Sequence, residues 1–287
     1  MPQRENTPVL ATLLRDHTTG RNIFWATHDY ESLGKEYDYH SEILPHLVTG
    51  ENEMVIRPRV LKSKAQQTDR SKGMAEVFTP SWVCNAQNNL VEEALPEGMT
   101  WKEYVRLTCL EITCGEAPYL VSRYDTTTGE AIPIEHRIGL LDRKLRMVSE
   151  HVDESTEWLK WAQTAYMNTY GYEWQGDNLL LARESLLWSF MEYYEAKFGK
   201  SPMLRSINYI AYIISWNLWQ MDGLKGVVPD SCRDGVKEKI MTLFGEEEQT
   251  VNCPGCQQED IRRHNGTYCL IKDWGTGKKI RFIDLIK

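Results

Sequence analysis

The chain has 287 residues, of which 41% are hydrophobic, and its net charge is −8. This length suits one large domain or a core domain with an appendage, and the negative charge argues against a protein that coats nucleic acid through a uniformly basic surface. The N-terminal residues lack the pattern of a secretion signal, and no run approaches the roughly 18 apolar residues of a membrane span. We therefore expect a cytoplasmic protein with no membrane partner.

Residues 1–70 are predicted to form an N-terminal extension with a strand or two near "NIFWATHDY". The end of this extension is basic, because six cations surround a single acid, Asp69: Arg57, Arg59, Lys62, Lys64, Arg70 and Lys72. Such a segment could follow the phosphates of a nucleic acid. The alternative is a solvated surface loop, which is the usual state of a run of charges.

A regular pattern begins near residue 71. Thr79 and Pro80 predict a helix start, with Thr79 as the cap and Pro80 at the first helical position. The stretch "RLTCLEIT", residues 106–113, predicts a short strand that ends in a turn at Cys114 and Gly115. A further helix is expected to start near Pro118, because proline is accepted in a first helical turn.

The following segments alternate between helices and strands. Helices are predicted over 137–152 and 155–170, a strand over 170–174, and two longer helices whose apolar stripes reach Phe198 and Leu218. Residues 218–224, "LWQMDGL", predict a last strand and turn. This alternation is typical of an α/β fold with a parallel sheet and helices on both faces. Most of the ten tryptophans lie in helical stripes, which favours core packing for them.

Three acids lie where predicted strands end: Glu111, Glu173 and Asp222. Ligands of open α/β sheets bind outside the carboxyl ends of the strands. A single acid at such a place is more often a helix cap or a surface charge. Three in succession predict a site for a nucleoside with a charged tail. One carboxylate would orient the amine of the ligand, the second would accept from the ribose hydroxyls, and the third would accept from the exocyclic amine of the purine.

Four stretches, in this order, carry a resemblance to a known family: "AEVFTPSWV", "LEITCGEAPYL", "TYGYEWQGDNLLLARESLL" and "NLWQMDGL". Their succession over roughly residues 70–228 resembles the S-adenosylmethionine motifs of N6-adenine DNA methyltransferases from restriction–modification systems. The resemblance implies a Rossmann-like methyltransferase sheet in residues 71–230, S-adenosylmethionine as cofactor, and adenine in DNA as acceptor. It also implies DNA as a partner, and a second restriction–modification subunit as another.

The resemblance assigns cofactor contacts to ten residues. Phe78, Thr79 and Pro80 would surround the methionine moiety, and Glu111, Thr113, Cys114 and Gly115 would form the turn after the first strand. Glu173 and Trp174 would hold the ribose and flank the adenine, and Asp222 would meet the adenine amine. Two features depart from the family pattern. Ala117 stands where a second glycine is common, and the catalytic signature "[DN]PP[YF]" is missing after Asp222, so no catalytic residue can be assigned.

The remaining residues, 231–287, predict a small C-terminal module. Cys253 and Cys256 form a C-x2-C pair, the spacing with which a turn offers two of the four ligands of a tetrahedral zinc site. His264 and Cys269 are the first choice for the other two ligands, and Cys232 is the other candidate. The alternative is a reduced pair without metal. The last ten residues predict a closing strand.

These observations favour an S-adenosylmethionine-dependent DNA methyltransferase-like protein, with structural zinc as a second bound group. A competing hypothesis is a non-catalytic, zinc-bearing DNA-binding or assembly subunit that keeps the methyltransferase fold as a scaffold. A third is a methyltransferase that acts on RNA, protein or a small molecule.

Overall fold

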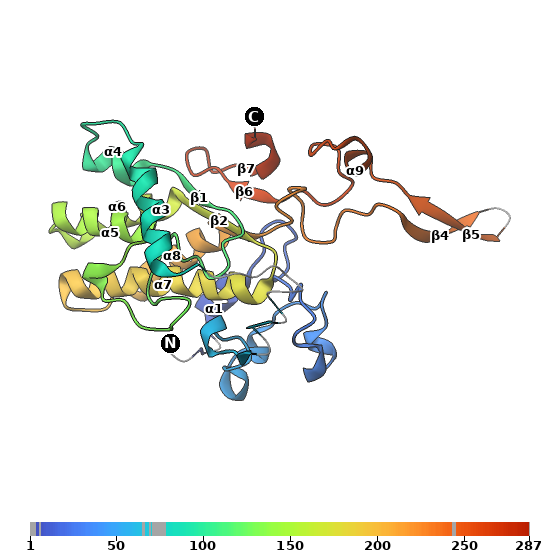
Figure 1. Cartoon of the computed structure of the whole chain (residues 1–287), viewed down its shortest axis with the longest axis horizontal. Helices are drawn as coiled ribbons and strands as arrows, with labels where there is room; N and C mark the ends of the chain where they lie inside the picture. The colour runs from blue at the N-terminus through green and yellow to red at the C-terminus, as the bar shows by residue number, and fades with distance from the viewer. Residues whose placement is uncertain are drawn as a thin grey trace.

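The computed structural model describes residues 4–5, 7–64, 67–68, 70, 79–242 and 245–286. These residues form a mixed α/β fold (Figure 1). The α-helices are α1 (Pro8–Leu14), α3 (Ser81–Glu93), α4 (Trp101–Arg106), α5 (Leu140–His151), α6 (Ser155–Met167), α7 (Gly176–Phe198), α8 (Leu204–Asn217) and α9 (Pro254–Gln258). The strands are β1 (Cys109–Glu111), β2 (Thr169–Glu173), β3 (Leu218–Gln220), β4 (Val236–Thr242), β5 (Gly245–Val251), β6 (Leu270–Lys272) and β7 (Lys279–Arg281).

Strands β1, β2 and β3 form a parallel sheet in that order, as the alternation of strands and helices predicted. Cys109 lies opposite Thr169, and Gly171 lies opposite Leu218. Each crossover contains two helices, α5 and α6 between β1 and β2, and α7 and α8 between β2 and β3. All three strands therefore end at the same edge of the sheet.

The two faces of the sheet are covered differently, which corrects the expectation of helices on both faces. Leu218 and Cys109 belong to the main core with α5–α8, whereas Tyr172 and Trp219 pack in a second, smaller cluster with residues of the C-terminal module. The cause is the strand order. Successive parallel strands that advance in one direction have right-handed crossovers on one face, so the described helices of both crossovers lie on the same side.

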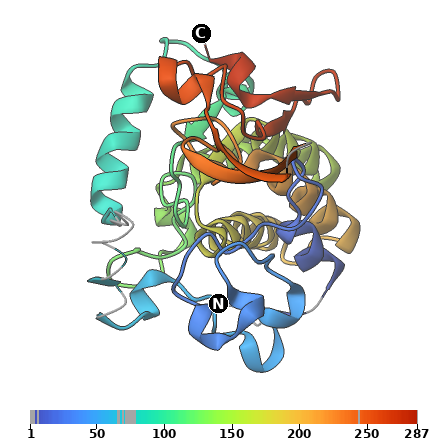
Figure 2. The same ribbon diagram turned by 90° about the vertical axis from the view of Figure 1, so that its right-hand side faces the viewer.

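The described residues of the N-terminal segment pack into the main core and form no regular sheet. Residues as far apart as Leu10 and Ile56 belong to the same cluster as the helices. The strands expected here are reduced to isolated antiparallel bridges, such as the one between Phe24 and Glu42. Figure 2 shows this segment on the side of the α/β part opposite the C-terminal residues.

Two local predictions in the region of the first motif are wrong. Helix α3 starts at Ser81 with Pro80 as its N-cap, because the Asp125 carboxylate caps it by accepting from the Ser81 N–H at 2.9 Å. No helix starts at Pro118. The backbone turns there and stays irregular until α5, apart from a 3₁₀ turn at Ile134–His136.

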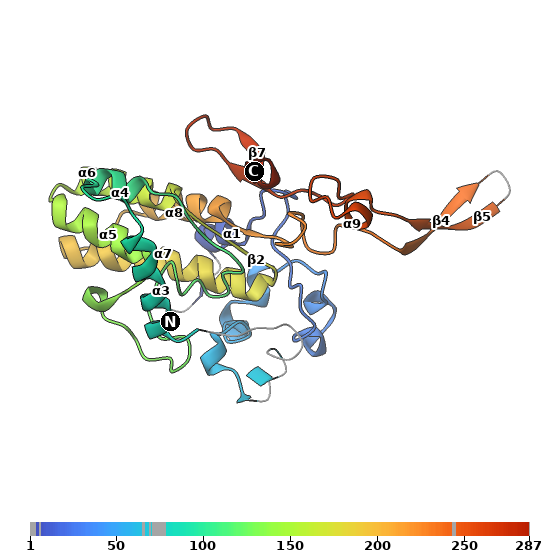
Figure 3. The ribbon, with the colours of Figure 1, turned by 45° about the horizontal axis from the view of Figure 1, so that its top comes forward.

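The C-terminal residues form two antiparallel hairpins. The β4–β5 hairpin extends away from the rest of the molecule in both views that show its length (Figures 1 and 3). The β6–β7 hairpin and the 3₁₀ helix Phe282–Leu285 lie against the second cluster of the sheet. The predicted closing strand is thus shorter than expected, because it bends into this 3₁₀ helix after Arg281.

Candidate functional site

Two of the three acids at strand ends meet through the turn that follows β1. Glu111 ends β1 and accepts hydrogen bonds from the N–H groups of Tyr119 and Leu120, at 3.3 and 3.2 Å. Glu173 ends β2 and accepts from the N–H of Gly115 at 2.8 Å and of Gln175 at 3.2 Å. One turn therefore binds both carboxylates, and the cofactor contacts that the sequence predicted for "LEITCGEAPYL" stay a prediction.

The backbone of this turn needs left-handed conformations at alternate residues. The φ angles are 45° at Thr113, 53° at Gly115 and 60° at Ala117. Glycine adopts such angles without strain, whereas other residues do so at a cost of about 1–3 kcal/mol. Ala117, which stands where the resembled family often has glycine, thus holds the backbone conformation that glycine favours. Successive N–H groups of such a turn can converge on an anion or a carboxylate.

Burial changes the titration of the groups around this turn. Burial raises the pKa of Glu111 to about 8, although the two N–H donors oppose this rise. The negative charge of Glu173 also raises this pKa. Burial also raises the pKa of Glu173, although the N–H groups of Gly115 and Gln175 oppose this. The pKa of the Cys114 thiol is raised by burial and by both carboxylates. Buried acids with perturbed pKa values are found in functional sites and also in structural ion-pair networks.

Other residues from the resembled motifs make contacts of their own. The carbonyl of Thr79 accepts from the Thr126 hydroxyl at 3.0 Å, and Pro80 caps α3. Trp174 follows Glu173, and its indole N–H donates to the Tyr39 hydroxyl at 3.0 Å. Phe78 lies outside the described residues.

The third acid, Asp222, uses its carboxylate within its own turn. Its Oδ1 accepts from the N–H groups of Leu224 and Lys225 at 3.0 and 3.2 Å, and its Oδ2 lies 3.9 Å from the Lys225 ammonium. Asp222 also bridges to Val227. The described contacts therefore link Glu111 with Glu173, while they engage Asp222 as a local cap.

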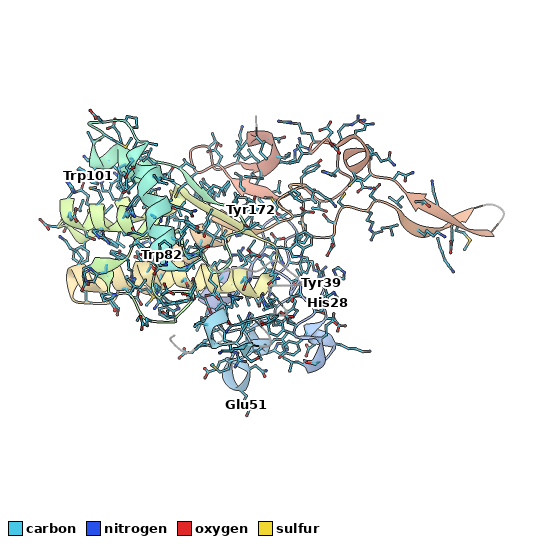
Figure 4. The ribbon with its side chains drawn as sticks, viewed as in Figure 1. His28, Tyr39, Glu51, Trp82, Trp101 and Tyr172 are labelled. Atoms are coloured by element: carbon cyan, nitrogen blue, oxygen red, sulfur yellow. The ribbon has the colours of Figure 1, made fainter. Side chains whose placement is uncertain are left out.

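The N-terminal segment contributes residues that sequence reasoning did not identify. The Phe24 N–H donates to the Gln220 side chain at 3.0 Å, so this segment crosses the carboxyl end of β3. Nearby, a cavity of about 890 Å³ is lined by His28, Glu31, Asp38, Tyr39, His40, Ser41 and Asp230. Figure 4 shows His28 and Tyr39 close together, with ring centroids 4.8 Å apart. Burial, together with a hydrogen bond to Asp230, raises the pKa of Tyr39 to about 12.

Two cations of the basic segment are neither solvated, as in a surface loop, nor available for contacts with phosphates. Lys62 and Arg70 are buried and lie 3.2 and 3.0 Å from Oδ2 of Asp177, in the first turn of α7. Burial alone would raise the pKa of Asp177, but the two cations hold it well below its ordinary value. The Tyr30 hydroxyl also donates to this oxygen at 2.8 Å. These charges therefore join the N-terminal segment to the sheet domain.

The C-terminal module contains a candidate metal centre made of Cys232, Cys253, Cys256 and His264. The Cys232 sulfur lies 3.4 Å from the Cys253 sulfur and 3.6 Å from the Cys256 sulfur. The His264 Nδ1 lies 3.5 to 3.6 Å from all three sulfurs. A tetrahedral zinc site with Zn–S bonds of about 2.3 Å has sulfur–sulfur separations of about 3.8 Å, so this donor set fits one tetrahedral ion. Cys253 is buried and the other three residues are partly buried. Four protein ligands around one ion leave no position for water or substrate, as in a structural site.

Cys269 is not part of this cluster, which corrects the first choice for the fourth ligand. Its buried thiol lies 3.4 Å from the carbonyl of Gln220, under β3, and belongs to the second core cluster. Cys232 is the fourth member of the cluster instead. It lies just before the β4–β5 hairpin and Cys253 lies just after it, so the hairpin brings the two residues together. The long separation of Cys232 from the C-x2-C pair hid this arrangement in the sequence.

Comparisons with family models, with curated proteins and with solved structures find no match for this chain. Among the described residues, no helix has the length and apolar character needed to cross a bilayer.

Proposed function

We propose that this chain binds S-adenosylmethionine at the carboxyl ends of β1 and β2 and acts as the cofactor-binding part of a DNA methyltransferase. One observation carries the proposal: Glu111 and Glu173 end adjacent parallel strands and share one glycine-containing turn. Ligands of parallel sheets bind at this edge. Adenine N6 in DNA as acceptor comes from the motif resemblance.

In this proposal each acid has a separate role. Glu111 fixes the turn by accepting from Tyr119 and Leu120, and Glu173 exchanges its N–H donors for the ribose hydroxyls. Trp174, oriented by Tyr39, flanks the adenine. The cofactor supplies a methyl group bonded to a positively charged sulfur. An acceptor nitrogen would take this methyl group, which would leave the cofactor as a neutral thioether, and the nitrogen would release one proton to solvent.

This transfer needs few acid–base groups and depends mainly on positioning. An extruded base must be stacked upon and read at its edge. The 287 residues contain no two adjacent prolines, so the family's acceptor-binding signature cannot be formed from this chain. The proposed role is therefore cofactor binding, with the acceptor held by other residues.

Calorimetric titration with S-adenosylmethionine tests the proposal. We expect saturable binding by the wild-type chain and a loss of about 1.5–3 kcal/mol in Glu173→Ala, the usual contribution of hydrogen bonds to a charged group. Trp174→Ala should also weaken binding, because it removes the flanking ring. Glu195→Ala, on the exposed part of α7, is the matched control. Absence of binding by a folded wild-type chain would contradict the proposal.

A second candidate function is that of a zinc-bearing DNA-binding or assembly subunit, in which the sheet is only a scaffold. The Cys232, Cys253, Cys256 and His264 cluster favours it, because a structural zinc site stabilises a small module without providing catalysis. The two functions differ in one measurement. The scaffold subunit would bind a DNA duplex in an anisotropy titration but would show no heat with S-adenosylmethionine.

A further inference from the structure

Helix α3 turns a row of polar side chains toward α5. The row is spaced along one face of the helix and consists of Asn85, Asn88, Asn89 and Glu92. Asn88 is buried, and its amide donates to two backbone carbonyls, each at 3.1 Å. The other three side chains accept from the guanidinium of Arg143 in α5. A helix that packs on a domain usually buries an apolar stripe, so this polar row indicates a role other than core packing.

A cavity of about 620 Å³ opens beside this row. Its walls come from α3, α4 and α5 and from residues 135–138, and Figure 2 shows α3 along one side of the α/β part. Pockets for small organic ligands have volumes of about 300–1,000 Å³. No described residue of the predicted cofactor site lines this cavity, so it is separate from the carboxyl ends of β1 and β2.

The wall of the cavity is rich in N–H donors. Because the carbonyl oxygens of Asn85 and Asn89 both accept from Arg143 at 2.8 Å, their NH2 groups point away from that guanidinium. Neither NH2 group has an acceptor among the residues that the structure describes. In the same part of the chain, two buried groups also lack an acceptor, the Nε of Arg146 and the Nη1 of Arg137. Water, an ion or a ligand usually satisfies buried donors of this kind.

The charges in the wall are unequal. Two of its three arginines have carboxylate partners, Glu92 and Glu192, whereas Arg146 has none within the described ranges. Glu135 and Glu150 also line the cavity, but both are exposed, so salt screens their repulsion of a single anion. A long polyanion is disfavoured, because its neighbouring phosphates would pass over these two acids.

We propose that this cavity binds the phosphate group of a small phosphate ester. Arg146 and the NH2 groups of Asn85 and Asn89 donate to the phosphate oxygens, and guanidinium–phosphate pairs are among the strong hydrogen-bonded pairs. Donors from two helices approach from different directions, which suits a tetrahedral phosphate better than a planar carboxylate. The rest of the ester lies against Tyr104 and Met147, which line the cavity as well. This site does not depend on the proposed cofactor function.

Calorimetric titration with inorganic phosphate tests the site. We expect one saturable site in the wild-type chain, with an affinity about tenfold higher for phosphate than for acetate, since phosphate offers more charge and more acceptor oxygens to the donors. Ribose 5-phosphate should compete with phosphate, because the cavity has room for the sugar. A folded wild-type chain without saturable phosphate binding, or with equal affinity for acetate, would overturn the proposal.

Asn89→Asp separates ligand binding from a structural role. Aspartate keeps an oxygen that accepts from Arg143 but replaces the NH2 donor with a negative charge. We expect the phosphate affinity to fall about tenfold or more through like-charge repulsion. The thermal midpoint should stay the same or rise, because Arg143 gains a charged partner. Unchanged phosphate affinity in this variant would show that Asn89 only supports Arg143, and would contradict the proposal.

Arg146→Ala should also weaken phosphate binding about tenfold or more, because it removes the guanidinium. The matched control is Arg205→Ala, at an exposed position of α8 outside the cavity, which should bind phosphate as the wild type does. An equal loss in both variants would mean that surface charge in general attracts phosphate, against a defined site. A DNA duplex that displaces phosphate, and binds less tightly to Asn89→Asp, would assign the donors to a polyanion and contradict a site for a small ester.

Discussion

At the scale of single residues, the sequence located the acids but not their environment. Glu111 and Glu173 were predicted at strand ends and are found sharing one turn. Their burial could not be predicted, because it depends on the segment from Gly115 to Leu120, which folds back over β1 where a helix was expected. The same limit applied to Lys62, whose partner Asp177 lies more than a hundred positions away.

The raised pKa of Glu111 predicts how stability depends on pH. Its carboxyl group binds a proton more tightly in the folded than in the unfolded chain, so its stabilisation is complete below the ordinary pKa of 4.5 and is lost as the pH rises through about 8. We expect the free energy of unfolding to fall by up to about 5 kcal/mol over this range, and Glu111→Gln to remove much of that fall.

Urea denaturation between pH 5 and pH 8.5 measures this dependence. Glu173 keeps part of the effect in the variant, because burial raises its pKa as well. Glu195→Gln, at an exposed position of α7, should follow the wild-type curve. If Glu111→Gln declines with pH as steeply as the wild type, Glu111 is not the titrating group.

At the scale of elements, apolar periodicity predicted the long helices well and the irregular segments poorly. Helix α6 lies within a few residues of its predicted range, and α7 and α8 end at or next to the ends of their predicted apolar stripes, because these stripes face one core. The N-terminal extension was misread, since apart from the short helix α1 its described structure consists of bridges and 3₁₀ turns held by contacts to distant residues. Short segments of this kind carry no periodic signal.

One such distant contact predicts the effect of a single methyl group. The Gly176 N–H donates to the Trp25 carbonyl at 3.0 Å, and a Cβ at this position would lie 2.1 Å from the Phe24 carbonyl oxygen. Gly176→Ala should therefore push the N-terminal segment away from α7 and cost about 1–3 kcal/mol, as overpacking in a core does.

Urea denaturation measures the loss, and limited proteolysis within residues 22–43 reports release of the segment. Ala196→Ser, at an exposed position of the same helix, adds one atom without this clash and should leave both unchanged. Wild-type proteolysis rates in Gly176→Ala would show that the segment is held by other contacts.

At the scale of the whole molecule, the α/β part and the C-terminal module pack against each other on one side of the sheet. Different interactions stabilise each of them. The α/β part has a large apolar core, whereas the four clustered Cys and His side chains lie outside both hydrophobic clusters. The sequence predicted a zinc module from the C-x2-C pair. It could not show that Cys232 and Cys253 flank the β4–β5 hairpin, because only the folded hairpin brings them together.

This arrangement predicts the consequence of metal removal. We expect about one zinc ion per chain, since four ligands make one tetrahedral site, and its loss in Cys232→Ser but not in Cys269→Ser, whose thiol lies under β3. Chelation should open the base of the hairpin and speed proteolysis within residues 233–252, while the main urea transition keeps its midpoint because the large core contains none of the ligands. Metal analysis of the two serine variants decides the ligand set. Zinc lost equally from both, or retained in Cys232→Ser, would mean that the ion is held by another group of side chains.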